Sequence, residues 1–226
     1  MVFFGSFEEQ RRRIRATLGL KPHERAVKVT GGSASTAADL ASLARDFEMA
    51  RAFFDSYAAI PDGQKDPASA NQAFWIAGII MYGRAFGTGM RHSARASVNV
   101  YSDEQRVTHN FVMALRNKYV AHSVNGFEQA SVFAILDGYA PDKLAISGVG
   151  TQHGSLASVR TEKARLMSSL CDVQLADIGA RKGEVERAVM AELLAMGAER
   201  VLSLPELGMP AIDESAVSRG RSKSWE

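Results

Sequence analysis

Apolar residues recur at helical spacing through the first half of the chain. Between about 37 and 58 they fall on one face of a helix, and the residues at 61–63 supply its stop. Between about 70 and 86 the chain is apolar nearly all round, so we expect this helix to be buried at the centre of the fold. A short basic helix is predicted over about 6–18, and residues 31–35 are predicted to form a loop.

The next helix carries the clearest local signal. Ser102 and Gln105 have the spacing of a capping box, in which each side chain bonds the backbone N–H of the other residue. The helix should continue past Arg116 and end near residues 121–125. His109 is predicted to be exposed or to lie at an interface. The stripe that we expect to face inward consists of Val107, Phe111, Ala114 and Leu115.

Beyond this helix the apolar period changes. Two short apolar runs, 132–136 and 144–149, flank turn residues and predict a β-hairpin over about 131–150. The glycine-rich run 148–154 lacks the spacing of a dinucleotide-binding turn and is interpreted as a loop. One long helix, or two broken at glycines 179 and 183, is expected over about 161–196.

These elements predict a mainly α fold. We expect a four- to five-helix bundle with one added β-hairpin and a long C-terminal helix. Residues 1–36 would form a basic helix and loop, and 37–200 the helical domain with its hairpin. The polar residues 201–226 are expected to form a disordered tail.

The composition indicates the cellular compartment and narrows the kinds of site that the chain can form. A single cysteine, Cys171, cannot form an internal disulfide, which favours a reducing compartment, and its helical setting favours a buried thiol over a nucleophile. The longest apolar run, about 73–82, is half a membrane span, so we expect a cytoplasmic protein without membrane contact. The five histidines show no metal-ligand spacing, and a net charge of +2 does not by itself imply a nucleic-acid partner.

The candidate chemistry lies between Arg116 and His122. This segment places a permanent cation, the amide of Asn117 and an imidazole at the end of a helix. Arginine binds phosphate with two parallel hydrogen bonds, and histidine exchanges protons near neutral pH. An arginine and a histidine at a helix C-terminus also complement the helix dipole, so a purely structural interpretation stays open.

A second cation lies at the polar end of the apolar helix. Arg84 needs an anionic or carbonyl partner there, and a structural ion pair with Glu48 or Asp55 of the preceding helix is the favoured interpretation. The alternative is a nucleic-acid contact, which Arg84 would share with Lys118 and Tyr119 of the candidate segment.

The run Arg116-Asn117-Lys118-Tyr119-Val120-Ala121-His122 resembles the motif of HEPN domains (higher eukaryotes and prokaryotes nucleotide-binding). It is similar to versions in bacterial abortive-infection and toxin-like members. The order of helices over about 37–125 also resembles this family, which is a bundle of four or five helices. Toxin members often have a tyrosine two residues after the histidine, and this sequence has Val124 there.

The resemblance implies a homodimer in which two motifs face each other. It implies a metal-independent endoribonuclease of phage defence or stress response that needs no cofactor, with His122 as acid or base. Arg116 would then stabilise phosphate charge, and Asn117 would position His122 or the substrate. Other members are non-catalytic and bind a nucleotide, RNA or protein, and toxin-like members imply a protein inhibitor. A helical scaffold of another function remains a third interpretation.

Overall fold

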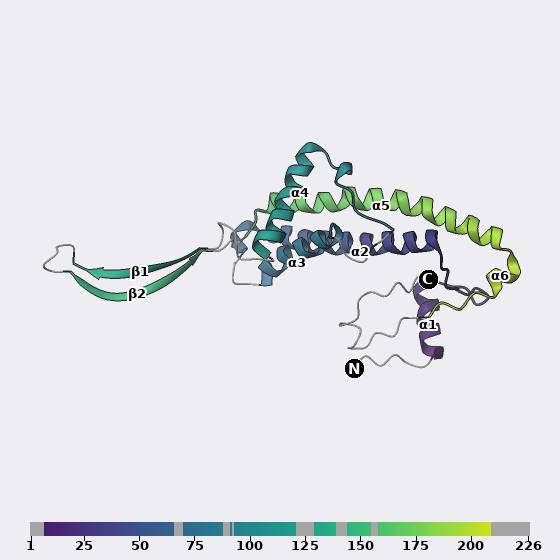
Figure 1. The fold of residues 1–226 in the computed structure, drawn as a ribbon. Coiled ribbons are helices and arrows are strands. Elements are labelled where there is room, and N and C mark those ends of the chain that lie inside the picture. The colour runs from purple at the N-terminus through teal and green to yellow at the C-terminus, as the bar shows by residue number, and fades with distance from the viewer. Residues whose placement is uncertain are drawn as a thin grey trace. The chain divides into compact units, whose positions relative to one another are not determined.

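The computed structural model describes residues 7–65, 70–87, 91, 93–120, 129–138, 144–154 and 158–208 (Figure 1). The chain is mainly helical with one two-stranded antiparallel sheet and a long helix near its C-terminal end, as the apolar pattern predicted. It divides into two compact units. The first comprises Met1–Ala41, Met90–Ala94 and Ala180–Glu226, and the second comprises Ser42–Gly89 and Arg95–Gly179.

The first unit joins segments from the two ends of the chain. Helix α1 (Phe7–Leu18) is followed by a strand-like residue, Val27, which forms an antiparallel bridge with Glu206. Arg11 pairs with the same Glu206 at 2.7 Å. Residues 201–208 therefore contain the end of the short helix α6 (Ala198–Leu202) and this bridge, whereas the rest of the predicted tail lies outside the described residues.

Helix α2 (Gly32–Ala58) begins earlier than its apolar stripe suggested. Ser35 donates its backbone N–H to the carbonyl of Gly31 at 2.9 Å, so the first helical turn is already formed there. The predicted loop at 31–35 is therefore wrong. The stripe itself is confirmed, because its large side chains are fully buried at Leu40, Leu43, Phe47, Ala50 and Phe54.

Helix α3 (Ala70–Ala85) supplies the centre of the second unit. Trp75, Ile79 and Tyr82 are fully buried, which confirms the central position expected from its apolar composition. Ile80 is 46% exposed, so one side of the helix remains open.

Helix α4 (Asp103–Leu115) starts with the predicted capping box. Ser102 Oγ accepts from the backbone N–H of Gln105 at 3.3 Å, and Gln105 Oε1 accepts from the backbone N–H of Ser102 at 3.0 Å. The predicted inward stripe is wrong at Val107, which is 67% exposed, and at Ala114, which is also exposed, whereas Leu115 is buried. The buried positions of this helix are Thr108, His109, Val112 and Leu115.

Helix α5 (Thr161–Met196) is one unbroken helix, which settles the choice that the sequence left open. Cys171 is fully buried within it, as expected, and burial raises the pKa of its thiol. The start of α5 is held by Asp62, whose side chain accepts from Thr161 N at 3.1 Å and from Thr161 Oγ1 at 2.7 Å. Within the described ranges, no helix is both long and apolar enough to cross a membrane.

The hairpin consists of β1 (Gln129–Asp137) and β2 (Ala145–Gly154). The strands pair antiparallel, with a bulge between Ile135 and Leu136, so the predicted hairpin is confirmed and extends beyond 131–150. The glycine-rich run 148–154 lies in β2 and pairs along its whole length, so its interpretation as a loop is wrong. A glycine-containing run can still pair because the ladder uses backbone groups alone.

Candidate functional site

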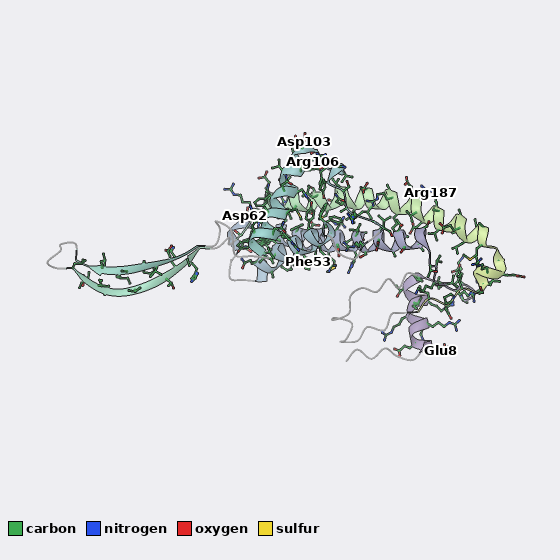
Figure 2. The ribbon with its side chains drawn as sticks, viewed as in Figure 1. Glu8, Phe53, Asp62, Asp103, Arg106 and Arg187 are labelled. Atoms are coloured by element: carbon green, nitrogen blue, oxygen red, sulfur yellow. The ribbon has the colours of Figure 1, made fainter. Side chains whose placement is uncertain are left out.

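The candidate segment begins where α4 changes from α-helical to π-helical geometry. After Leu115, which is 3% exposed, the chain continues as a π-helical turn, Arg116–Val120. A π-turn inserts an extra residue into a helix and rotates the residues that follow it, and such turns are frequent at functional sites. Asp103 and Arg106 mark the first turns of the same helix in Figure 2.

Gly83 of α3 determines where the side chain of Arg116 lies. A Cβ atom at position 83 would be 2.8 Å from Arg116 Cγ and 3.3 Å from Arg116 Cδ. Carbon atoms in contact are normally about 3.5–4.0 Å apart, so only glycine leaves room for this approach. The aliphatic part of the Arg116 side chain therefore lies directly on the backbone of α3, although Arg116 as a whole remains exposed to solvent.

The guanidinium of Arg116 is held by its neighbour. Arg116 Nη1 donates to Asn117 Oδ1 at 2.9 Å, and both residues are exposed. Among the described residues, no carboxylate lies within ion-pair distance of Arg116. The guanidinium is therefore held by Asn117 with no carboxylate partner among these residues, and an arrangement of this kind can bind an anion.

Tyr119 attaches the other end of the π-turn to α3. Its ring stacks on the buried indole of Trp75, with ring centroids 5.7 Å apart and an interplanar angle of 23°. The turn is thus fastened at two points, Arg116 on Gly83 and Tyr119 on Trp75, while Lys118 between them is exposed. This accounts for a defined geometry at the end of α4.

Arg84 forms a structural ion pair with the preceding helix, as favoured, but its partner is Asp46. Arg84 Nε donates to Asp46 Oδ1 at 3.1 Å, and a second bond comes from Nη2. The expected partners were wrong because Asp46 lies on the buried face of α2 and is 1% exposed, whereas Glu48 and Asp55 are exposed. The hydrogen bonds that Arg84 donates to this carboxylate raise the pKa of Arg84.

His109 was expected to be exposed and is instead buried, with 8% exposure. Its Nδ1 lies 2.8 Å from Tyr82 Oη, which lies 2.9 Å from Tyr101 Oη. Tyr101 in turn donates to the backbone carbonyl of Leu170 at 3.3 Å. This chain of hydrogen bonds joins α3, α4 and α5 and was missed by sequence reasoning.

The direction of the protons in this chain follows from its last bond. Since Tyr101 gives its hydroxyl proton to Leu170, Tyr82 donates to Tyr101, and His109 carries its proton on Nδ1 and donates to Tyr82. Burial lowers the pKa of His109 and raises the pKa of both tyrosines, so all three groups stay neutral at pH 7. One signal could have found the histidine: it lies three residues before Val112 and six before Leu115, on the face that is buried.

Three consecutive residues of α3 each contact another helix, and Gly83 is the one that meets the candidate segment. Tyr82 bonds His109 of α4, Gly83 receives Arg116 and Arg84 pairs with Asp46 of α2. His122, the third candidate catalytic residue beside Arg116 and Asn117, belongs to the segment 121–128, which lies outside the described residues. In the part of the chain that the structure describes, no group of three metal-ligating side chains occurs.

Comparisons with family models, with curated proteins and with solved structures found no match to this chain.

Proposed function

We propose that the chain is a HEPN-like ribonuclease that cleaves RNA without a metal ion, acting as a dimer. The observation that supports this best is the guanidinium of Arg116, held by Asn117 and lying on Gly83 without a carboxylate partner among the described residues. A purely structural arginine at a helix end would be expected to bond a backbone carbonyl or a carboxylate, and Arg116 bonds a side-chain amide instead. This one is oriented and keeps its charge available for a phosphate.

The surrounding helices support the same proposal. The motif follows a helix that packs on an apolar central helix, and a π-turn sets the direction of the residues after Leu115. Asn117 orients the arginine through its side-chain oxygen, and we propose that its amide also positions His122 or the substrate, as the resemblance implies. Lys118 and Tyr119 flank the arginine, with Lys118 exposed at the surface of the turn.

In the proposed reaction, His122 removes the proton of a ribose 2′-hydroxyl. The 2′-oxygen attacks the neighbouring phosphorus, and the bond from phosphorus to the 5′-oxygen of the next nucleotide breaks. That oxygen leaves with a proton from an imidazolium, which in the dimer belongs to the second copy. Arg116 binds the non-bridging oxygens as negative charge develops on them, and the products are a 2′,3′-cyclic phosphate and a 5′-hydroxyl.

The test is an RNA-cleavage assay in excess chelator with transfer RNA and ribosomal RNA as substrates. The variants are Arg116→Ala, His122→Ala and, as a matched control, Arg165→Ala. Arg165 is an exposed residue of α5, so the control removes the same charge outside the site. Near-ultraviolet circular dichroism and thermal unfolding confirm that each variant is folded.

Cleavage that yields cyclic phosphate ends, and that is lost in both site variants but not in the control, would support the proposal. Loss of about 100-fold or more is expected for each, because removal of one transition-state charge contact or of a general base has effects of this size. If the folded protein binds RNA through Arg116 but does not cleave it, the chain is a binding module and the nuclease proposal fails. Cleavage that persists equally in all variants would place the activity elsewhere.

A further inference from the structure

The charge of this chain is unevenly distributed. Residues 7–30 hold seven basic and three acidic side chains, a net charge of +4, whereas the whole chain has a net charge of +2. Helix α1 supplies four of these cations, and all four are arginines: Arg11, Arg12, Arg13 and Arg15. A cluster of charges of one sign raises the local potential and attracts ligands of the opposite charge.

Contacts within the first unit hold α1 in place. Arg15 Nη1 donates to the backbone carbonyl of Glu24 at 2.8 Å, and its Nη2 bonds the carbonyl of Lys21. Arg11 pairs with Glu206 at 2.7 Å. A carbonyl orients a guanidinium without neutralising it, so Arg15 both fixes the helix and remains a cation.

Three of the arginines line one hollow on the surface of α1. The hollow has a volume of about 390 Å³ and is lined by Glu8, Arg11, Arg12 and Arg15. Residues three and four apart lie on the same face of a helix, so this face carries three positive charges and one negative charge. Arg12 is exposed, and in the described part of the chain no carboxylate lies within ion-pair distance of it.

This face suits a phosphate backbone better than a membrane surface. A helix that lies on a membrane needs a broad apolar face opposite its cations. Among the described side chains of α1, Leu18 is the one large apolar group that is exposed, and Ile14 lines a cavity with Leu20 and Leu207. Arginine, unlike lysine, presents a planar fork that bonds two phosphate oxygens at once.

We propose that this face of α1 binds the phosphate backbone of single-stranded RNA, independently of Arg116. Arg12 bonds the phosphate oxygens, and the charge of Arg15 adds to the attraction. Binding is independent of sequence, because phosphate contacts carry no information about the bases. The choice of RNA over other polyanions rests on the proposed function, since RNA is the substrate proposed there.

The test measures how the full chain binds a short fluorescent 2′-O-methyl RNA, by anisotropy at several salt concentrations. This probe lacks the 2′-hydroxyl that the proposed reaction needs, so it reports binding whether or not the chain is a nuclease. The variants are Arg12→Gln and Arg12→Glu. The matched control is Arg187→Gln, which removes the charge of an exposed arginine of α5 in the same unit, near Glu184 and Glu186 (Figure 2).

We expect Arg12→Gln to weaken binding by about three- to fivefold, the effect of one exposed ion pair. The slope of log K against log salt should become less steep by about 0.7, the contribution of one phosphate contact to a single strand. Arg12→Glu changes the charge by two units, so the expected weakening is about 10- to 25-fold. Arg187→Gln should change binding by less than about twofold.

Three results would overturn the inference. A wild-type chain that does not bind the probe is the first. The second is an equal effect of Arg12→Gln and Arg187→Gln, which would indicate a response to net charge alone. The third is displacement of the probe by phosphatidylserine vesicles or by poly-glutamate as effective as that by unlabelled RNA, which would assign the face to a lipid surface or an acidic protein.

Failure of this inference can be told apart from failure of the proposed function. RNA that is bound through Arg12 but not cleaved contradicts the nuclease and leaves this inference intact. Cleavage of RNA by a chain whose Arg12 variants bind the probe as the wild type does contradicts this inference and leaves the nuclease intact.

Discussion

Gly83→Ala tests whether the contact between α3 and Arg116 sets the geometry of the site. The new Cβ atom would be 2.8 Å from Arg116 Cγ. Since carbon atoms in contact lie about 3.7 Å apart, the arginine stem must move by about 0.9 Å. Arg116 is exposed and can move outward, so the displacement changes the position of the guanidinium more than it strains the core.

The expected result separates activity from stability. A displacement of about 1 Å in a positioning group can reduce a rate by about 100-fold, so kcat/KM for RNA should fall by about this factor. The free energy of unfolding should stay the same or rise by about 0.5–1 kcal/mol, because alanine is the better residue within a helix. The assays are RNA cleavage in chelator and urea unfolding of the same preparation.

Gly78→Ala is the matched comparison on the same helix. A Cβ atom there would be 2.5 Å from Phe54 Cε1, and Phe54 is fully buried and cannot move into solvent. Overpacking should lower the free energy of unfolding by about 1–3 kcal/mol. The gain of about 0.5–1 kcal/mol from replacing glycine by alanine within a helix offsets only part of this loss. Equal destabilisation by the two substitutions would refute the reasoning, as would a Gly83→Ala protein that cleaves RNA at the wild-type rate.

Two further predictions concern the buried hydrogen-bond chain. Tyr82→Phe removes the acceptor of His109 and the donor to Tyr101, so urea unfolding should show a loss of about 1–3 kcal/mol; an unchanged midpoint would contradict the assigned bonds. Burial lowers the pKa of His109 from its ordinary value of 6.5, so the unfolded chain binds a proton first as the pH falls. The contribution of His109 to the free energy of unfolding is therefore full above pH 6.5 and decreases below it. In His109→Gln, the urea midpoint should consequently depend less on pH between about pH 8 and 5.5. An equal slope in both proteins would be evidence against this titration.

Local sequence determined much of the fold. The capping box of Ser102 and Gln105 could be predicted because both partners lie within one helical turn. The apolar stripe of α2 and the change of period that produces the hairpin are likewise properties of short windows. The segment from Arg116 could also be selected from residue types and spacing alone.

Tertiary contacts decided which face of α4 is buried, which carboxylate pairs with Arg84 and where Arg116 lies. Within one helix the alternative faces and partners differ little in energy, so the local sequence does not select between them. Helix α4 has two partly apolar faces, and the hydrogen bond that His109 donates to Tyr82 favours the face with His109 over the face with Val107. Asp46 rather than Glu48 receives Arg84 because the packing of α2 turns it toward α3. Gly83 gave no sign in the sequence of the arginine that it accommodates, since Arg116 is 33 residues away and meets it only when α3 and α4 pack together.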